Sequence, residues 1–154
     1  MSLNTSADEA GKRAPVEITL DEAKTLLARA VEERGADFTY TMLTIDGGPL
    51  CAYFDPKTKA PSCIVGQVLA YKGVTFEDLW AEEVNTYANI EALNDQGVVK
   101  VDNDTQALLE IAQSEQDAGM PWGRAVEEAL ATYEGRAQAY EEDGYDDPSL
   151  AYWF

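Results

Sequence analysis

The sequence predicts a single α+β domain that is mostly helical, with a β-hairpin or a small three-stranded antiparallel sheet packed against about five helices. Apolar residues recur at helical spacing between capping residues and glycines. Two β-rich runs flank an Asp-Gly-Gly-Pro turn, as in a hairpin. A length of 154 residues with 45% hydrophobic residues suits one core. We expect a domain over residues 16–140, between a disordered N-terminal lead-in (1–15) and an acidic-aromatic C-terminal tail (141–154).

The first helix has a clear start signal. Thr19 and Glu22 have the spacing of a capping box, in which each side chain accepts a hydrogen bond from the other residue's backbone N–H. Gly35 is a typical helix-terminating residue. The apolar face between these signals consists of Leu20, Ala23, Leu26, Leu27, Ala30 and Val31.

A hairpin and a short helix are expected next. Residues 38–45 and 50–54 are the two β-rich runs of the hairpin. Pro61 and Ser62 then begin a short helix, with Ser62 as its N-cap and Gly73 as its end. The expected buried face of this helix is Ile64, Val65, Val68 and Leu69.

The middle of the chain repeats the capping pattern. Residues 75–78 (Thr-Phe-Glu-Asp) open another helix. The side chains expected to face inward from it are those of Phe76, Leu79, Trp80 and Val84. A helical turn over residues 89–94 precedes a short strand at 98–101, which would complete a three-stranded sheet.

Two long helices end the predicted domain. Asp102 and Asp104 cap a helix that ends at Gly119, and Pro121 suits the first turn of the last helix. The last helix has one continuous apolar stripe, made of Trp122, Val126, Ala129, Leu130, Tyr133, Ala137 and Tyr140. The glutamates off this stripe are Glu127, Glu128 and Glu134. Residues 141–154 leave the helical pattern.

Negative charge is concentrated in the second half of the chain. Residues 1–72 contain 8 Lys/Arg and 10 Asp/Glu, whereas residues 73–154 contain 3 and 19, so the net charges are −2 and −16 out of −18. Such a surface repels nucleic acid and acidic membranes and attracts basic surfaces. We therefore expect a basic protein as partner, without direct binding to nucleic acid or membrane. The charge also favours a monomer.

The composition argues against most enzyme classes. The chain has no histidine, which removes Ser-His-Asp and Cys-His arrangements and HExxH metal sites. Gly47-Gly48 is followed by Pro49 and not by a lysine, so it is no phosphate loop. Residues 102–104 lack the glycine and terminal glutamate of a calcium loop. We expect no catalytic residue, no metal and no cofactor.

Cys63 supports one alternative hypothesis. It follows the predicted N-cap Ser62, where a helix N-terminus can lower the pKa of a thiol. A small enzyme or ligand-binding domain could use Cys63 and nearby carboxylates, whereas a packing role in the core is the simpler interpretation. No apolar run has the length of a membrane span and no secretory signal is present, which indicates the cytoplasm. Two reduced cysteines are therefore favoured over a disulfide between Cys51 and Cys63.

The acidic surface has several interpretations. It could imitate the charge array of DNA, form an ordinary protein-binding face, or simply be solvated. A structural or self-assembling role is a further alternative. On the binding hypotheses, charge pairing would come from Glu127, Glu128, Glu134, Glu141, Glu142, Asp143, Asp146 and Asp147. The anchors would be Tyr145, Trp153 and Phe154, unless the tail folds back over the core.

Two segments resemble a known group of proteins. Residues 61–66 (Pro-Ser-Cys-Ile-Val-Gly) and 116–123 (Gln-Asp-Ala-Gly-Met-Pro-Trp-Gly) look like segments of small uncharacterised accessory proteins of actinobacterial phages. The resemblance assigns no activity to any residue. It implies a phage-encoded protein in the host cytoplasm that modulates or inhibits a basic host protein, as anti-defence DNA mimics do. Such a host protein could itself be a DNA-binding protein.

Overall fold

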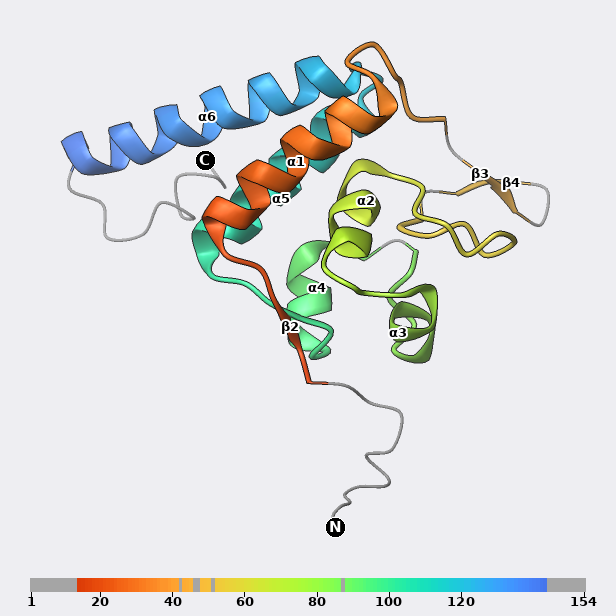
Figure 1. The fold of residues 1–154 in the computed structure, drawn as a ribbon. Helices are drawn as coiled ribbons and strands as arrows, with labels where there is room; N and C mark the ends of the chain where they lie inside the picture. The colour runs from red at the N-terminus through yellow and green to blue at the C-terminus, as the bar shows by residue number, and fades with distance from the viewer. Residues whose placement is uncertain (1–13, 42, 46–47, 51, 87, 144–154) are drawn as a thin grey trace.

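The fold is mostly helical, in agreement with the α+β prediction. The computed structural model describes residues 14–143 except 42, 46–47, 51 and 87, and it describes side chains in that range except at 42–51, 87 and 136–143. Three long helices pack together: α1 (Leu20–Arg34), α5 (Asn103–Asp117) and α6 (Trp122–Asp143) (Figure 1). Three short helices complete the described part: α2 (Ile64–Tyr71), α3 (Phe76–Ala81) and α4 (Ile90–Asp95).

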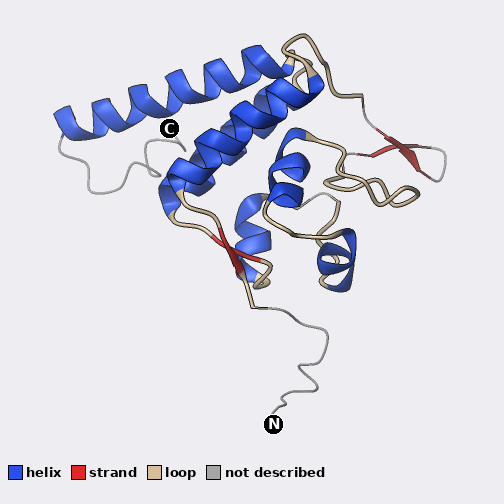
Figure 2. Ribbon diagram, in the orientation of Figure 1, coloured by secondary structure: helices blue, strands red, loops and turns tan. Residues whose placement is uncertain are grey.

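The strands form two separate two-stranded ladders (Figure 2). β2 (Val16–Glu17) pairs in parallel with β5 (Val99–Lys100), and β3 (Leu43–Ile45) pairs antiparallel with β4 (Gly48–Leu50). The predicted three-stranded antiparallel sheet is therefore not confirmed. The strand near residue 99 pairs with the segment before α1, because Val16 N donates to Val98 O at 3.0 Å and Ile18 N donates to Lys100 O at 3.1 Å. The two ladders share no strand, so β5 is not part of a sheet with β3 and β4.

The predicted capping signals are present at the helix starts. Thr19 Oγ1 accepts from Glu22 N at 3.2 Å, and Glu22 Oε1 accepts from Thr19 N at 3.0 Å, which is the expected capping box of α1. Thr75 and Asp78 make the same reciprocal pair at α3. Asp102 caps α5 by accepting from Thr105 N at 2.8 Å. These local signals therefore fix where the helices begin.

The N-cap of α2 was predicted one residue too early. Cys63, and not Ser62, is the N-cap, and its Sγ accepts from Gly66 N at 3.4 Å. Ser62 Oγ instead donates to Tyr40 Oη at 3.4 Å. A sulfur is a weak acceptor, but α5 supplies stronger ones, since the Ile64 amide donates to Gln116 Oε1 at 2.7 Å. Tertiary contacts therefore decided this boundary.

The core lies where the apolar patterns placed it, except at Trp80. Trp122, Ala129 and Tyr133 are buried on the inner face of α6, as the stripe predicted. Trp80 was predicted to face inward, but it is 62% exposed because Phe76 and Leu79 already occupy the buried side of the short α3.

The predicted end of the last helix also needs correction. Its backbone stays helical through Asp143, so residues 141–143 belong to the helix and not to a tail. The lead-in residues 1–13, Cys51 and residues 144–154 lie outside the described residues, and so do the side chains of Ala137 and Tyr140. None of the helices in the described ranges combines the length and the apolarity of a membrane span.

Candidate interaction surface

The outer face of α6 carries the described part of the predicted acidic site. The inner face of this helix packs on α1 and α5 through its buried residues Trp122, Ala125, Val126, Ala129 and Tyr133. Glu127 and Glu134 lie on the opposite side and are exposed. They are seven residues apart, which places them on one line of the helix at a separation of about 10 Å. A packed helix therefore holds both carboxylates in a defined arrangement.

Glu128 differs from these two glutamates. It forms an ion pair with Arg124, in which Arg124 Nε lies 3.6 Å from Glu128 Oε2. Both side chains are well exposed. A pair of this kind contributes little to stability. Neither Glu127 nor Glu134 forms an ion pair with a described residue. Among the described side chains of this face, Glu127 and Glu134 therefore supply most of the net negative charge.

The remaining predicted contact residues fall at or beyond the end of the described chain. Glu141, Glu142 and Asp143 are on the helical backbone of α6, but their side chains are not among those described. The other predicted contact residues, Tyr145, Asp146, Asp147, Trp153 and Phe154, lie outside the described residues. The role of these residues stays a prediction.

Tyr133 links the inner side of α6 to the acidic start of α5. Burial, followed by the charge and hydrogen bond of Asp104, raises the pKa of Tyr133 to about 12. The phenol therefore keeps its proton at neutral pH. On the other side, Lys24 Nζ lies 5.9 Å from the centre of the Tyr133 ring. This tyrosine thus helps to fix α6 between α1 and α5.

Two cations of the first half, Lys72 and Arg29, form ion pairs with acids of the same half. Lys72 Nζ lies 2.8 Å from Glu22 Oε2, and its hydrogen bond is the main reason for the lowered pKa of Glu22. Arg29 and Glu33 form a second pair at 3.2 Å on α1. These pairs neutralise acids of the first half. Among the described side chains, Arg124 is the cation that pairs with an acid of α6.

The sequence interpretation missed an acidic-aromatic surface on α3. Trp80 stacks on Phe76, with 5.4 Å between ring centres and 26° between the ring planes. Lys59 reaches this helix from the loop before α2 and pairs with Glu77 at 3.2 Å. No sequence signal gave this exposure, because the end of α3 at Ala81, which leaves too little buried face for Phe76, Leu79 and Trp80 together, is seen only in the structure.

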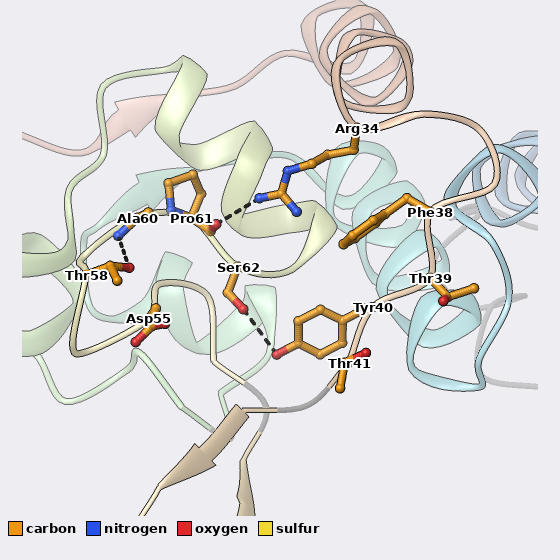
Figure 3. Close-up of a pocket in the computed structure, with 10 residues that line it drawn as sticks. All are labelled: Arg34, Phe38, Thr39, Tyr40, Thr41, Asp55, Thr58, Ala60, Pro61 and Ser62. Atoms are coloured by element: carbon orange, nitrogen blue, oxygen red, sulfur yellow. Dashed lines mark hydrogen bonds between the residues drawn. The ribbon is translucent and has the colours of Figure 1, made fainter.

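A cavity of about 280 Å³ lies between the end of α1 and the loop before α2 (Figure 3). It is lined by Arg34, Phe38, Thr39, Tyr40, Thr41, Asp55, Thr58, Ala60, Pro61 and Ser62. Arg34 Nη2 donates to Pro61 O at 3.1 Å and to Gln67 Oε1 at 3.2 Å. Its guanidinium carbon also lies 5.1 Å and 5.2 Å from the ring centres of Phe38 and Trp122. Arg34 thus holds the fold together at this point.

Cys63 lies outside that cavity. The thiol-based alternative required a pocket beside Cys63, but this residue is fully buried and does not line the cavity that Pro61 and Ser62 border. Its sulfur caps α2. No group of three or more Cys, Asp and Glu side chains that could hold a metal ion is found among the described residues. The observed geometry of Cys63 therefore fits the packing interpretation.

The two segments that carry the phage-protein resemblance meet in the core. Residue 64 of the first donates to Gln116 of the second, as described above. Gly66 and Gly123 both allow close approaches, to the Tyr53 carbonyl and to Ala36 respectively. These features serve packing. The chain matches no family model, no curated protein and no solved structure, so its function is inferred from its own residues.

Proposed function

We propose that this chain is a non-enzymatic acidic interaction protein, phage-encoded, that binds and modulates or inhibits a basic host protein. The observation that carries the proposal is the two-sided character of α6. Its inner face is buried against α1 and α5, while Glu127 and Glu134 project from its outer face. Carboxylates held on a packed helix keep their spacing, which a partner with matching cations can recognise.

The charge distribution supports a basic partner. Residues 73–154 have a net charge of −16, so a cationic surface is attracted before any short-range contact forms. Screening by salt reduces this attraction, because the Debye length falls to about 8 Å at physiological ionic strength. Binding through α6 should therefore weaken steeply as salt is added.

DNA mimicry is the form of this function in which the partner is a DNA-binding protein. Duplex DNA presents one charge per about 1.7 Å of its axis. Glu127 and Glu134 alone, about 10 Å apart, are sparser than that. A mimic would need the further acids predicted to act with them, Glu128, Glu141, Glu142, Asp143, Asp146 and Asp147.

The test compares two double variants with equal changes in net charge. The chain is immobilised, and proteins of an actinobacterial host lysate are captured at low salt and identified. In Glu127→Gln/Glu134→Gln, capture of a basic protein should fall severalfold. In the control, Glu17→Gln/Glu32→Gln, two exposed acids of the first half are neutralised and capture should persist. Equal losses in both variants, or no captured basic protein, would contradict the proposal.

Two additions separate the forms of the function. Duplex DNA added to the captured complex should displace the partner if the acids imitate DNA, and should leave it bound otherwise. Neutralising the acids at 141–143, 146 and 147 tests the predicted contribution of the last residues of α6 and of the acids beyond it. Unchanged capture in that variant would restrict the interaction to the part of α6 before residue 141.

A further inference from the structure

Trp80 is an aromatic side chain held in place at the surface. It is 62% exposed and is the one large apolar side chain described as exposed in the characterised part of the chain. One face of its indole stacks on Phe76, which is itself 8% exposed. The ring is therefore supported from below while much of its surface remains in water. Tryptophan in such a position is the residue type most enriched among interface hot spots.

The side chains around Trp80 are mainly acidic. Glu77 precedes it by almost one helical turn, and Glu83 follows it by three residues; both are exposed. Lys59 lies nearby, but it is held by Glu77 and by the Phe76 ring, whose centre is 5.6 Å from Nζ. The surroundings of the indole thus favour a positively charged group over an anionic one.

The end of α3 has a charged residue in a left-handed backbone conformation. Glu83 has φ of 59°, in the left-handed region, and the next residue, Val84, donates to Leu79 O at 3.0 Å. The same helix-ending motif occurs at α2, α4 and α5, where the left-handed residue is Gly73, Gly97 or Gly119. Only at α3, among these four ends, is the position occupied by a charged residue. The chain therefore has a charged residue, whose backbone N–H donates to Trp80 O at 3.1 Å, at a position where glycine would be less strained.

We infer that the α3 surface, defined as Glu77, Trp80 and Glu83, binds an arginine or lysine side chain of the partner protein. The cation would lie over the outward part of the indole, since the face of a tryptophan ring attracts positive charge. Glu83 would pair with the same cation or its neighbours, whereas Glu77 would share its carboxylate between Lys59 and the incoming cation. This inference rests on the proposed function for the basic character of the partner, but it concerns a different surface from α6.

Charge complementarity selects this occupant over others. A second copy of the chain would bring another strongly negative half against the first, and nucleic acid would be repelled for the same reason. A basic protein segment satisfies both the indole and the carboxylates. A purely apolar partner would pack on Trp80 but would form no new ion pair with Glu77 or Glu83.

The experiment is a titration of the full chain with a hexa-arginine peptide, followed by ¹H–¹⁵N NMR. The indole N–H resonance of Trp80 is assigned by its loss in Trp80→Phe. We expect it to shift saturably, while the indole of Trp122, which is fully buried, stays in place. Trp80→Ala should weaken peptide binding by about three- to tenfold, as expected for a loss of one cation–π contact. Trp80→Phe should retain part of the affinity.

Two further variants make the outcome decisive. Unchanged amide spectra away from α3 show that Trp80→Ala folds. If the peptide binds Trp80→Ala as tightly as the unmodified chain and loses affinity only in Glu127→Gln/Glu134→Gln, the α3 inference is overturned and the proposed function stands. If the peptide shifts no resonance, both are overturned. Trp80-dependent self-association in the absence of peptide would also overturn the inference, because the occupant would then be a second copy.

Discussion

Ile64 and Gln116 are joined by a 2.7 Å hydrogen bond, in which the Ile64 amide donates to Gln116 Oε1. Both side chains are almost completely buried. The bond connects the first turn of α2 to the last turn of α5 across 52 residues of sequence. Gln116 Nε2 in turn donates to Asp117 Oδ1 at 2.8 Å, which orients the amide. The N-terminus of α2 is therefore capped from another helix.

Gln116→Leu should destabilise the protein by about 1–3 kcal/mol, because the buried Ile64 N–H would lose its acceptor. Urea unfolding followed by circular dichroism measures this free energy. Gln113→Leu is the matched control, since Gln113 accepts from Val65 at 3.4 Å in a half-buried position. Its cost should be clearly smaller. An equal loss in the free energy of unfolding for the two variants would mean that the Gln116 hydrogen bond contributes no more to stability than the Gln113 bond does.

Glu83→Gly should stabilise the protein by about 0.5–1 kcal/mol, because glycine adopts the left-handed conformation without the steric cost of a Cβ. The same substitution at Glu82, whose φ is −99°, should be destabilising. Thermal unfolding of the two variants gives the comparison. A loss of stability in Glu83→Gly would indicate that its side chain contributes more to the fold than its backbone costs.

Gly66→Ala should prevent or severely impair folding, because a Cβ at this position would overlap the carbonyl oxygen of Tyr53. The backbone on both sides is buried and cannot move away cheaply. Gly135→Ala in α6 is the opposite case, since no described atom other than the surrounding helical backbone lies within 4 Å of a Cβ there. It should stabilise the helix by about 0.5–1 kcal/mol. Soluble yield and the melting temperature of both variants check the pair of predictions.

Glu110→Gln should raise stability at neutral pH. Burial raises the pKa of Glu110, so the folded chain holds its proton more tightly than the unfolded chain does. The resulting penalty develops as pH rises above the unfolded pKa of about 4.3 and is complete above the folded pKa. Glutamine keeps an oxygen that can accept from Glu91 N, as Oε2 does now at 3.4 Å.

Melting temperatures at pH 7 and pH 4 measure this effect. The gain in Glu110→Gln should be largest at pH 7 and should shrink toward pH 4. Glu127→Gln removes the same charge from an exposed site and corrects for the change in net charge. A gain in Glu110→Gln that is constant over this range would contradict a protonation penalty at Glu110.

The sequence predicted the helices well because their signals are local. Thr19 with Glu22 and Thr75 with Asp78 define helix starts through contacts three residues apart. The stripe on α6 predicted which side is buried, and therefore where Glu127 and Glu134 lie. The sheet was not predictable in this way. The partner of a strand is decided by contacts between distant residues, such as Val16 with Val99.

The features of the candidate site also differ in whether local sequence signals or contacts between distant residues decide them. The sequence by itself determined the excess of acid in the second half and the placement of Glu127 and Glu134 on the outer face of α6, since helical periodicity assigns faces without reference to the rest of the fold. Only the tertiary structure decided that Cys63 is a buried cap and that Trp80 remains exposed. The reason is competition for limited buried space: Phe76 and Leu79 fill the inner side of α3, and Gln116 reaches the α2 terminus from another helix.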